Sequence, residues 1–374
     1  MQAFEYCVPT RIVFGKDSVE KLPEQLKKSG ASRVLVVYGG HSAKKSGLLD
    51  RVLALLGGAG VSYDTLGGVQ PNPHLGLARE GVKKAIAHGR ANPDIDIWDF
   101  WLGKKKVEKS TPVGVILTIP ASGSETSDSA VLTDETILQK RGLNTDYNRP
   151  VFAIMDPTLA ATLPRRQVAC GVTDILMHTL ERYFNPIQGN ETTMQLAESV
   201  LRVTIANGPA VVDNPGDYDA MSEIMWCGSL SHNGLTGLGG AKGLSVHPVS
   251  FALSEKFDII HAEALSALWC SWARYVCKVN PENEKLFARF ARSVWDIAEP
   301  NIHKAANAGI DASEAYFKSL GMPVSIGALS CGVQDAAGVE DLAARVSYHG
   351  TRRVGTLVSL DHEALREIFE MANH

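Results

Sequence analysis

The sequence lacks paired cysteine motifs, long apolar runs and a strong excess of either charge. Its 374 residues contain six cysteines and no C-x-x-C pair, which favours reduced, buried thiols over a disulfide framework. No apolar run approaches the roughly 20 residues that span a bilayer. The first residues also lack the basic segment followed by an apolar stretch that is typical of an export signal. We therefore expect a soluble, cytoplasmic protein.

The overall charge gives no reason to expect a highly charged partner. The formal net charge is −4 and the isoelectric point is near 6.3, so neither nucleic acid nor an anionic membrane is an expected partner. Hydrophobic residues make up 45% of the chain and charged residues 21%, as in ordinary globular proteins. A chain of 374 residues exceeds what one hydrophobic core usually organises, so two domains are expected.

Short β-branched runs alternate with helical patterns over the first 160 residues. "SRVLVVYGG" (32–40) and "PVGVILTIPAS" (112–122) are typical of buried parallel strands, and "KSGLLDRVLALLGGAG" (45–60) has a helical spacing of leucines. This alternation predicts an α/β domain with a Rossmann-like parallel sheet over residues 1–160. Beyond it the apolar period is near 3.6 and strand patterns nearly vanish, so residues 161–374 are predicted to form a helical domain.

Two polar residues interrupt the apolar stretch "GVTDILMHTL". Asp174 and His178 stand four residues apart on a predicted helix, so their side chains are neighbours on one face. Such a pair alone is more often an ion pair or a hydrogen bond than a metal site. Two further histidines, His247 and His261, would lie about 21 Å apart on one continuous helix. Pro248 and the polar segment "SEKFD" interrupt the helical pattern between them, which would allow the chain to fold back.

If the chain folds back there, one aspartate and three histidines can surround a single cation. Three imidazoles and one carboxylate suit Fe²⁺, Zn²⁺, Co²⁺ or Ni²⁺. The spacing permits this metal site without requiring it.

Several longer segments resemble one enzyme family. "FGKDSVEKLPEQL", "YGGHSAKKSGLLDRVLALL", "GGVQPNP", "WDFWLGKKKVEKSTPVGVILTIPASGSE" and "MHTLERYF" occur in the order found in the iron-containing (group III) alcohol dehydrogenases, above all in their NADP-linked butanol dehydrogenase branch. The resemblance implies a dehydroquinate synthase-like architecture, with a nucleotide-binding domain followed by a metal-binding catalytic domain. The metal-ligand positions of the family fall on Asp174, His178, His247 and His261.

The resemblance also implies an activity and its cofactors. Primary alcohols and aldehydes would be interconverted by hydride transfer to and from a nicotinamide, with the four ligand residues acting through the metal. Fe²⁺ is the expected metal and Zn²⁺ the second choice. The metal would serve as a Lewis acid toward the alcohol or aldehyde oxygen. We further expect a homodimer in which the N-terminal strand "TRIVFG" pairs across the interface.

A nucleotide site is expected at the loop that follows the first predicted strand. Gly39, Gly40, His41 and Ser42 would face the adenosine ribose by resemblance, although locally they are equally typical of a plain strand-to-helix turn. No aspartate or glutamate ends this strand, where a carboxylate would bind the ribose 2′-hydroxyl and repel a 2′-phosphate. NADP(H) is therefore preferred over NAD(H).

Four more positions match cofactor-binding positions of the family. Taken locally they also have simpler interpretations, as turn residues or solvated surface. They are Asn72, Thr118, Ser122 and Lys140.

The chain departs from the family at two places. Phe251 occupies the position of a histidine thought to assist proton movement, and a phenyl ring cannot carry protons. The strand, Gly-Gly-Gly-Ser turn and helix that cradle the pyrophosphate are missing between Arg90 and Ala91. A parallel sheet cannot lose a central strand and its crossover helix without a gap. Because such a gap would destabilise the domain, we expect that the strand-turn-helix unit exists but is absent from the printed sequence. A genuine deletion is the alternative.

Two alternative functions follow from these departures. The chain could be a catalytically impaired, metal-binding paralogue without the pyrophosphate loop, or a glycerol dehydrogenase-like enzyme. The remaining eight histidines, His232 among them, have no metal-type spacing and are interpreted as core or surface residues.

Overall fold

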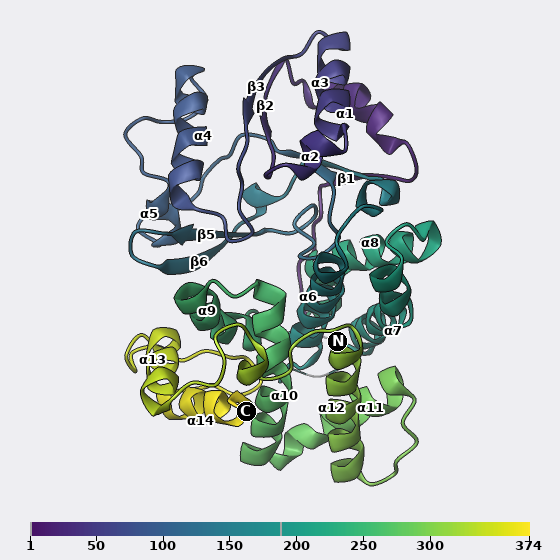
Figure 1. Cartoon of the computed structure of the whole chain (residues 1–374), viewed down its shortest axis with the longest axis vertical. Coiled ribbons are helices and arrows are strands. Elements are labelled where there is room, and N and C mark those ends of the chain that lie inside the picture. The colour runs from purple at the N-terminus through teal and green to yellow at the C-terminus, as the bar shows by residue number, and fades with distance from the viewer. Residues whose placement is uncertain (1, 188) are drawn as a thin grey trace. The chain divides into compact units, whose positions relative to one another are not determined.

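The computed structural model describes residues 2–187 and 189–374 (Figure 1). Contacts divide them into two compact units. The α/β unit contains residues 8–118 and 124–159. The helical unit contains residues 119–123 and 160–374, together with the N-terminal residues up to 7.

A three-stranded parallel sheet lies at the centre of the α/β unit. Its order is β1 (Arg11–Phe14), β7 (Phe152–Met155) and β4 (Gly114–Leu117). All four residues of β7, "FAIM", are buried, as expected for a parallel strand with a partner on each side. A second parallel pair consists of β2 (Arg33–Val37) and β3 (Ser62–Leu66).

The two parallel sheets are separate. Among the described residues, β2 pairs only with β3 and β4 pairs only with β7, so each keeps one edge without a strand partner. The apolar residues along β2 are half-buried or exposed, and Val115 and Ile116 of β4 are half-buried. These strands are therefore less covered than their β-branched sequences would predict.

Two helices cover part of these sheets. They are α1 (Leu22–Ser29) and α3 (Leu48–Gly58). Leu22 and Leu26 of α1 pack with Leu56 of α3 in one hydrophobic core. The segment with helical leucine spacing thus forms the predicted helix, which begins at residue 48 where the sequence pattern begins at 45.

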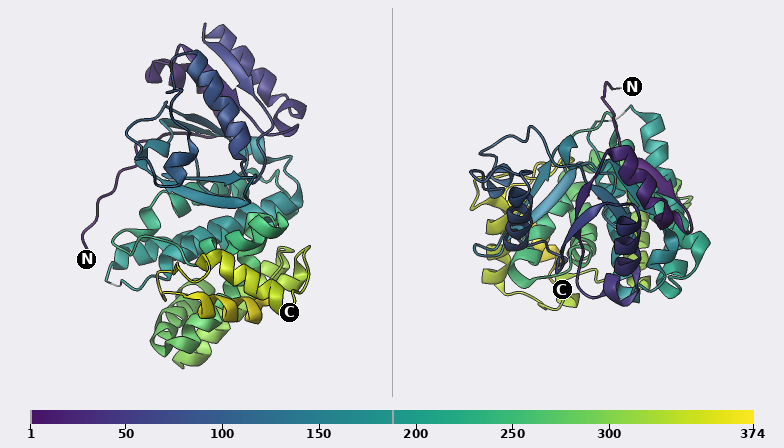
Figure 2. Two further views of the ribbon diagram at one scale, coloured as in Figure 1. Left: turned by 90° about the vertical axis from the view of Figure 1, so that its left-hand side faces the viewer. Right: turned by 90° about the horizontal axis from the view of Figure 1, so that it is seen from above.

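An antiparallel hairpin completes the α/β unit and is absent from the sequence prediction. It joins β5 (Ser129–Asp134) to β6 (Gln139–Asn144), with Leu138 in the left-handed region at the turn. The hairpin contacts α4 (Leu75–Ala87) and α5 (Trp98–Trp101) on the same side of the unit (Figures 1 and 2).

The helical unit contains no strand longer than a single bridge among its described residues. Most of the long helix α6 (Arg165–Tyr183) is buried, and α7 (Glu191–Asp213) and α8 (Tyr218–His232) pack along it. The other α-helices of this unit are α9 (Val246–Phe257), α10 (His261–Val279), α11 (Glu284–Trp295), α12 (Ile302–Ser319), α13 (Ala336–Ser347) and α14 (His362–Ala372). The predicted fold class, a parallel-sheet α/β domain followed by a helical domain, is confirmed.

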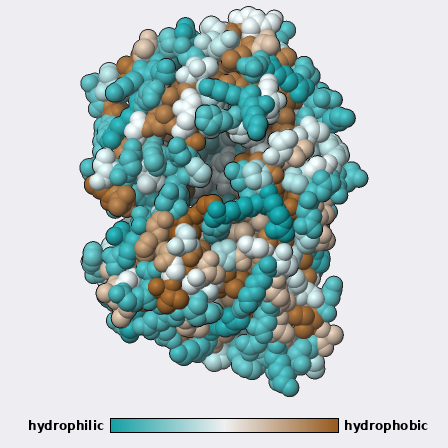
Figure 3. Space-filling model, viewed as in Figure 1, coloured by the Kyte–Doolittle hydropathy of each residue, from teal (hydrophilic) through white to brown (hydrophobic). Residues whose placement is uncertain are grey.

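The cysteines agree only in part with the expectation of reduced, buried thiols. All six cysteines are free thiols, and three of them are buried. No helix in the described part of the chain is both long and apolar enough to cross a membrane. The face shown in Figure 3 is mainly hydrophilic, with scattered hydrophobic side chains.

Candidate metal and nucleotide sites

Three buried side chains of the helical unit converge on one point. Asp174 and His178 project from adjacent turns of α6, and His247 projects from the first turn of α9. One potential ligand atom from each lies within 4.8 Å of the others. Oδ1 of Asp174 is 3.5 Å from Nδ1 of His178 and 3.9 Å from Nε2 of His247. One carboxylate and two imidazoles thus face each other inside the protein.

His261 approaches the same carboxylate from α10. Its Nε2 atom is 3.9 Å from Oδ1 of Asp174, and its ring centroid is 5.1 Å from that of His247. Its side chain is 27% exposed, whereas those of the other three residues are 8% exposed or less. His261 therefore forms the solvent-facing side of the cluster.

The chain folds back between His247 and His261 as predicted, within the segment "SEKFD" and not at Pro248. Pro248 does not break the helix, because it lies in the first turn of α9, where backbone N–H groups have no intrahelical acceptor. The helix ends instead at Asp258, whose φ of 53° places it in the left-handed region. After two intervening residues, α10 begins at His261.

Two imidazole nitrogens of this cluster lack a protein hydrogen-bond partner in the described part of the chain. Nδ1 of His178 and Nε2 of His247 are buried, with no hydrogen-bond partner among the described residues. Such groups are uncommon, because an unsatisfied buried polar atom costs free energy. A cation bound by these nitrogens and by Asp174 would satisfy them, so the residues present fit a divalent metal.

Burial and charge set the protonation of the two buried imidazoles. Burial lowers the pKa of His178 well below its usual value, so this ring is neutral and able to bind a cation. Burial also lowers the pKa of His247, but the carboxylates of Asp174 and Glu181 outweigh it and raise this pKa overall. A cation among these residues would compete with that proton.

Two residues of the site were missed by sequence reasoning. Glu181 is buried, and its Oε1 accepts hydrogen bonds from Nδ1 and the backbone N–H of His247, at 2.8 and 2.7 Å. It stands three residues after His178 on the same face of α6, so its helical spacing was an available signal. The buried ring of His232, from α8, lies 4.0 Å from that of His178 between centroids. No local motif marks His232, because only the packing of α8 on α6 brings it there.

The predicted ribose loop has a simple geometry. Gly39 and Gly40 follow β2, and the exposed Ser42 begins the short helix α2 (Ser42–Lys45), with His41 at its N-cap position. The carbonyl of Gly39 accepts a hydrogen bond from Gly68. The structure therefore presents this loop as an exposed strand-to-helix connection.

The structure brings together two of the other four predicted cofactor residues. Nζ of Lys140, on β6, donates a hydrogen bond of 3.0 Å to the side-chain oxygen of Asn72, in the "PNP" turn. Lys140 is buried, which excludes its interpretation as a solvated surface lysine. Thr118 is exposed at the end of β4.

Ser122 lies in a short segment packed against two helices of the helical unit. A Cβ atom on Gly171 of α6 would lie 2.2 Å from the carbonyl oxygen of Pro120, and one on Gly123 would lie 2.5 Å from that of Gly228 in α8. Glycine is thus required at both contacts, and Ser122 stays exposed between them.

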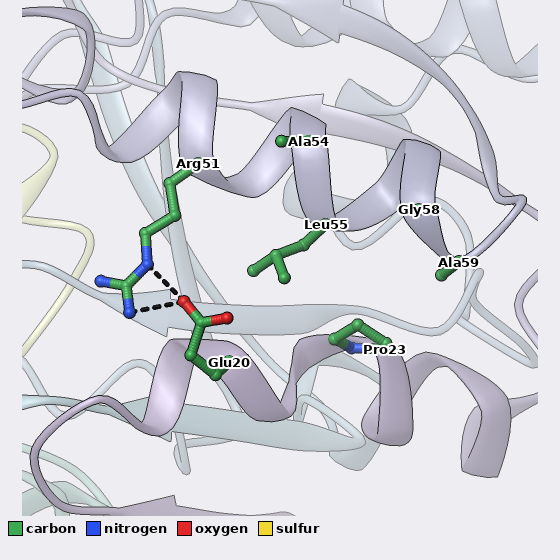
Figure 4. Close-up of a pocket in the computed structure, with 7 residues that line it drawn as sticks. All are labelled: Glu20, Pro23, Arg51, Ala54, Leu55, Gly58 and Ala59. Atoms are coloured by element: carbon green, nitrogen blue, oxygen red, sulfur yellow. Dashed lines mark hydrogen bonds and ion pairs between the residues drawn. The ribbon is translucent and has the colours of Figure 1, made fainter.

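A pocket in the α/β unit contains none of the predicted site residues. It lies between α1 and α3, next to the hydrogen-bonded pair of Arg51 and Glu20 (Figure 4). Its lining of Pro23, Ala54 and Leu55 offers little chemistry for catalysis.

Comparison with known proteins identifies the family of the chain. The family model "Iron-containing alcohol dehydrogenase" matches residues 9–92 and 82–157, and "Fe-containing alcohol dehydrogenase family, C-terminal" matches residues 168–372. The chain is 33% identical to NADH-dependent butanol dehydrogenase A of Clostridium acetobutylicum over 393 aligned positions, which cover 99% of each chain. It is 31% identical to the NADPH-dependent aldehyde reductase YqhD of Escherichia coli over the whole of both chains.

Solved structures agree with this relationship. The fold matches the crystal structure of NADH-dependent butanol dehydrogenase A from Thermotoga maritima with a TM-score of 0.93 and 28% identity, covering 100% of this chain and 99% of that one. The chain belongs to the iron-containing alcohol dehydrogenase family. Within it, the chain is a butanol dehydrogenase-like enzyme that acts on alcohols or aldehydes.

Proposed function

We propose that this enzyme interconverts primary alcohols and aldehydes by hydride transfer with NADP(H), using one divalent metal held by Asp174, His178, His247 and His261. The observation that carries the proposal is the buried cluster around Oδ1 of Asp174. A metal bound there supplies Lewis acidity toward the substrate oxygen. The carboxylate offsets part of the cation's charge, and the partly exposed His261 leaves one side of the cluster open to solvent.

Fe²⁺ is the proposed working metal. Zn²⁺ binds such donor sets more tightly than Fe²⁺, so zinc should accumulate in preparations handled in air. The metal found after purification then need not be the one that supports turnover.

The choice of NADP(H) depends on the loop after β2. Relatives of similar identity are named NADH-dependent and NADPH-dependent, so relationship alone does not select the cofactor. The sequence "YGGHSAKK" has no carboxylate there, and it carries Ser42 and Lys44, which favour a 2′-phosphate.

Titration of NADPH and of NADH into metal-loaded protein, followed by nicotinamide fluorescence, tests the proposal. We expect saturable NADPH binding, reduction of butanal in the same sample, and no turnover after the metal is removed by a chelator. Activity confined to glycerol would favour the glycerol dehydrogenase-like alternative.

A specific observation supports a second function, that of a metal-binding protein with impaired catalysis. The two parallel sheets are separate, and the two N-terminal family matches meet at residues 82–92, beside the Arg90–Ala91 junction. The alignment with the Clostridium enzyme spans 393 positions, more than the 374 residues of this chain. Stoichiometric metal binding with no detectable NADPH or NADH binding would establish this second function and exclude the first.

A further inference from the structure

Glu181 is a buried carboxylate that contacts His247, one of the candidate metal ligands. Its two oxygens bind the start of α9. Oε1 accepts hydrogen bonds from Nδ1 and the backbone N–H of His247, and Oε2 accepts one from the backbone N–H of Ser245. Its side chain is 1% exposed. All three donors come from two nearby residues, so this carboxylate holds one turn of backbone and one ring.

These hydrogen bonds fix the tautomer of His247. Because Nδ1 donates to Glu181, the neutral ring carries its proton on Nδ1 and a lone pair on Nε2. Nε2 is the atom that lies 3.9 Å from Oδ1 of Asp174. The contact with Glu181 therefore selects the nitrogen that faces the cluster and fixes the plane of the ring.

We propose that Glu181 is a positioning residue that presents Nε2 of His247 to the metal. The inference rests on the proposed metal site. A carboxylate that accepts a hydrogen bond from a metal-bound imidazole orients the ring and increases its basicity, and its loss typically weakens metal affinity about 10- to 100-fold.

Glu181→Gln removes this role with little change in volume. The amide has one acceptor oxygen and one donor NH₂ group, whereas three N–H donors converge on Glu181. Either orientation of the amide places an N–H group against another donor. With NH₂ at the Oε1 position the ring of His247 loses its acceptor; with NH₂ at the Oε2 position Ser245 loses its acceptor, and the ring keeps only a neutral, weaker one.

Glu198→Gln is a matched control. Glu198 is also a buried glutamate of the helical unit, and it accepts hydrogen bonds from Tyr183 at 2.9 Å and Arg289 at 2.7 Å. These hydrogen bonds of Glu198 involve none of the four candidate metal ligands. The control thus reports the cost of neutralising a buried glutamate without disturbing His247.

The test is a titration of the metal-free, full-length proteins with Co²⁺, whose visible absorption reports both affinity and ligand geometry. We expect Glu181→Gln to bind Co²⁺ about 10- to 100-fold more weakly than the parent, with an altered spectrum. Glu198→Gln should match the parent in both. Equal affinity and an unchanged spectrum for folded Glu181→Gln would overturn the inference. Absence of Co²⁺ binding by the parent protein would instead refute the proposed metal site.

A second measurement keeps the inference testable if Glu181→Gln does not fold. In zinc-loaded parent protein with ¹⁵N-labelled histidine, the His247 signal, assigned by its absence from His247→Gln, should show a protonated Nδ1 and a metal-bound Nε2. A proton on Nε2 or a metal-bound Nδ1 would overturn the assignment.

Discussion

His261 is the most exposed of the four candidate ligands, and it is the first residue of its helix. Replacing it removes one donor without opening a buried cavity, so His261→Ala should remain folded. We expect it to lose nearly all its metal on dialysis, because three donors hold a cation less tightly than four. Metal analysis after dialysis measures the loss. His303→Ala, at an exposed histidine paired with Glu284, is the control. Stoichiometric metal in dialysed His261→Ala would refute the four-ligand site.

Gly39 offers a residue-scale test of cofactor choice. A Cβ atom there would meet only the carbonyl oxygen of Val69, at 3.7 Å, and the φ angle of Gly39 is not positive, so a side chain fits. We expect Gly39→Asp to raise the KM for NADPH about tenfold relative to that for NADH, because a carboxylate repels the 2′-phosphate. Gly39→Ala, which adds the Cβ atom without charge, should keep the preference of the parent. Equal kinetics with both cofactors in the parent would refute the NADP preference.

The helices show what periodicity can and cannot predict. The 3.6-residue pattern places Asp174 and His178 on one face of α6, and the structure places them there. The pattern could not decide between Pro248 and "SEKFD" as the place of the fold-back, because proline is tolerated in a first turn and the helix ends at Asp258 of "SEKFD". It also could not find His232, which reaches the site only through the packing of α8 on α6.

Strand prediction missed β5, β6 and β7, and β6 shows one physical reason. The run "QKRGLN" of β6 has little β-propensity and contains a glycine, so its sequence gave no strand signal. Its pairing with β5 and the contact of Lys140 with Asn72 depend on tertiary structure. In contrast, the β-branched runs of β2 and β4 were predicted correctly as parallel strands.

The open edges of β2 and β4 lead to a prediction about local stability. In a parallel ladder, alternate N–H groups point to opposite edges, so part of each strand's amide hydrogens has no strand acceptor among the described residues. Strand β7 is paired on both sides. Hydrogen exchange resolved by peptide should therefore be slow in β7 and faster in β2 and β4. Equal protection of all three strands would mean that a further strand covers these edges.

Intact mass spectrometry decides at the scale of the whole molecule whether a strand is missing. A strand with its turn and crossover helix needs at least about 20 residues. Deletion of this unit should destabilise the domain by more than its free energy of unfolding, which is roughly 5–15 kcal/mol for a typical domain. We therefore expect a mass about 2 kDa or more above the 40.3 kDa of the printed chain. A mass of 40.3 kDa would mean a true deletion and would favour the impaired, metal-binding function.

Dimer formation should depend on strand β1. This strand pairs with β7 along one edge, and no described strand pairs with the other. The N–H groups of Arg11 and Gly15 bond to the carbonyls of Val151 and Met155, so the N–H of Ile12 points to the open edge. We expect a homodimer formed by pairing along this edge, with twice the chain mass in light scattering.

Ile12→Pro tests this dimer without touching the ladder to β7. Proline is tolerated on an edge strand, and here it removes one outward N–H donor. The variant should shift the protein toward the monomer, whereas Ile12→Ala, which loses side chain but keeps its N–H group, should stay dimeric. Dissociation by alanine alone would assign the interface to side-chain packing rather than strand pairing. A monomeric parent at micromolar concentration would exclude the proposed dimer.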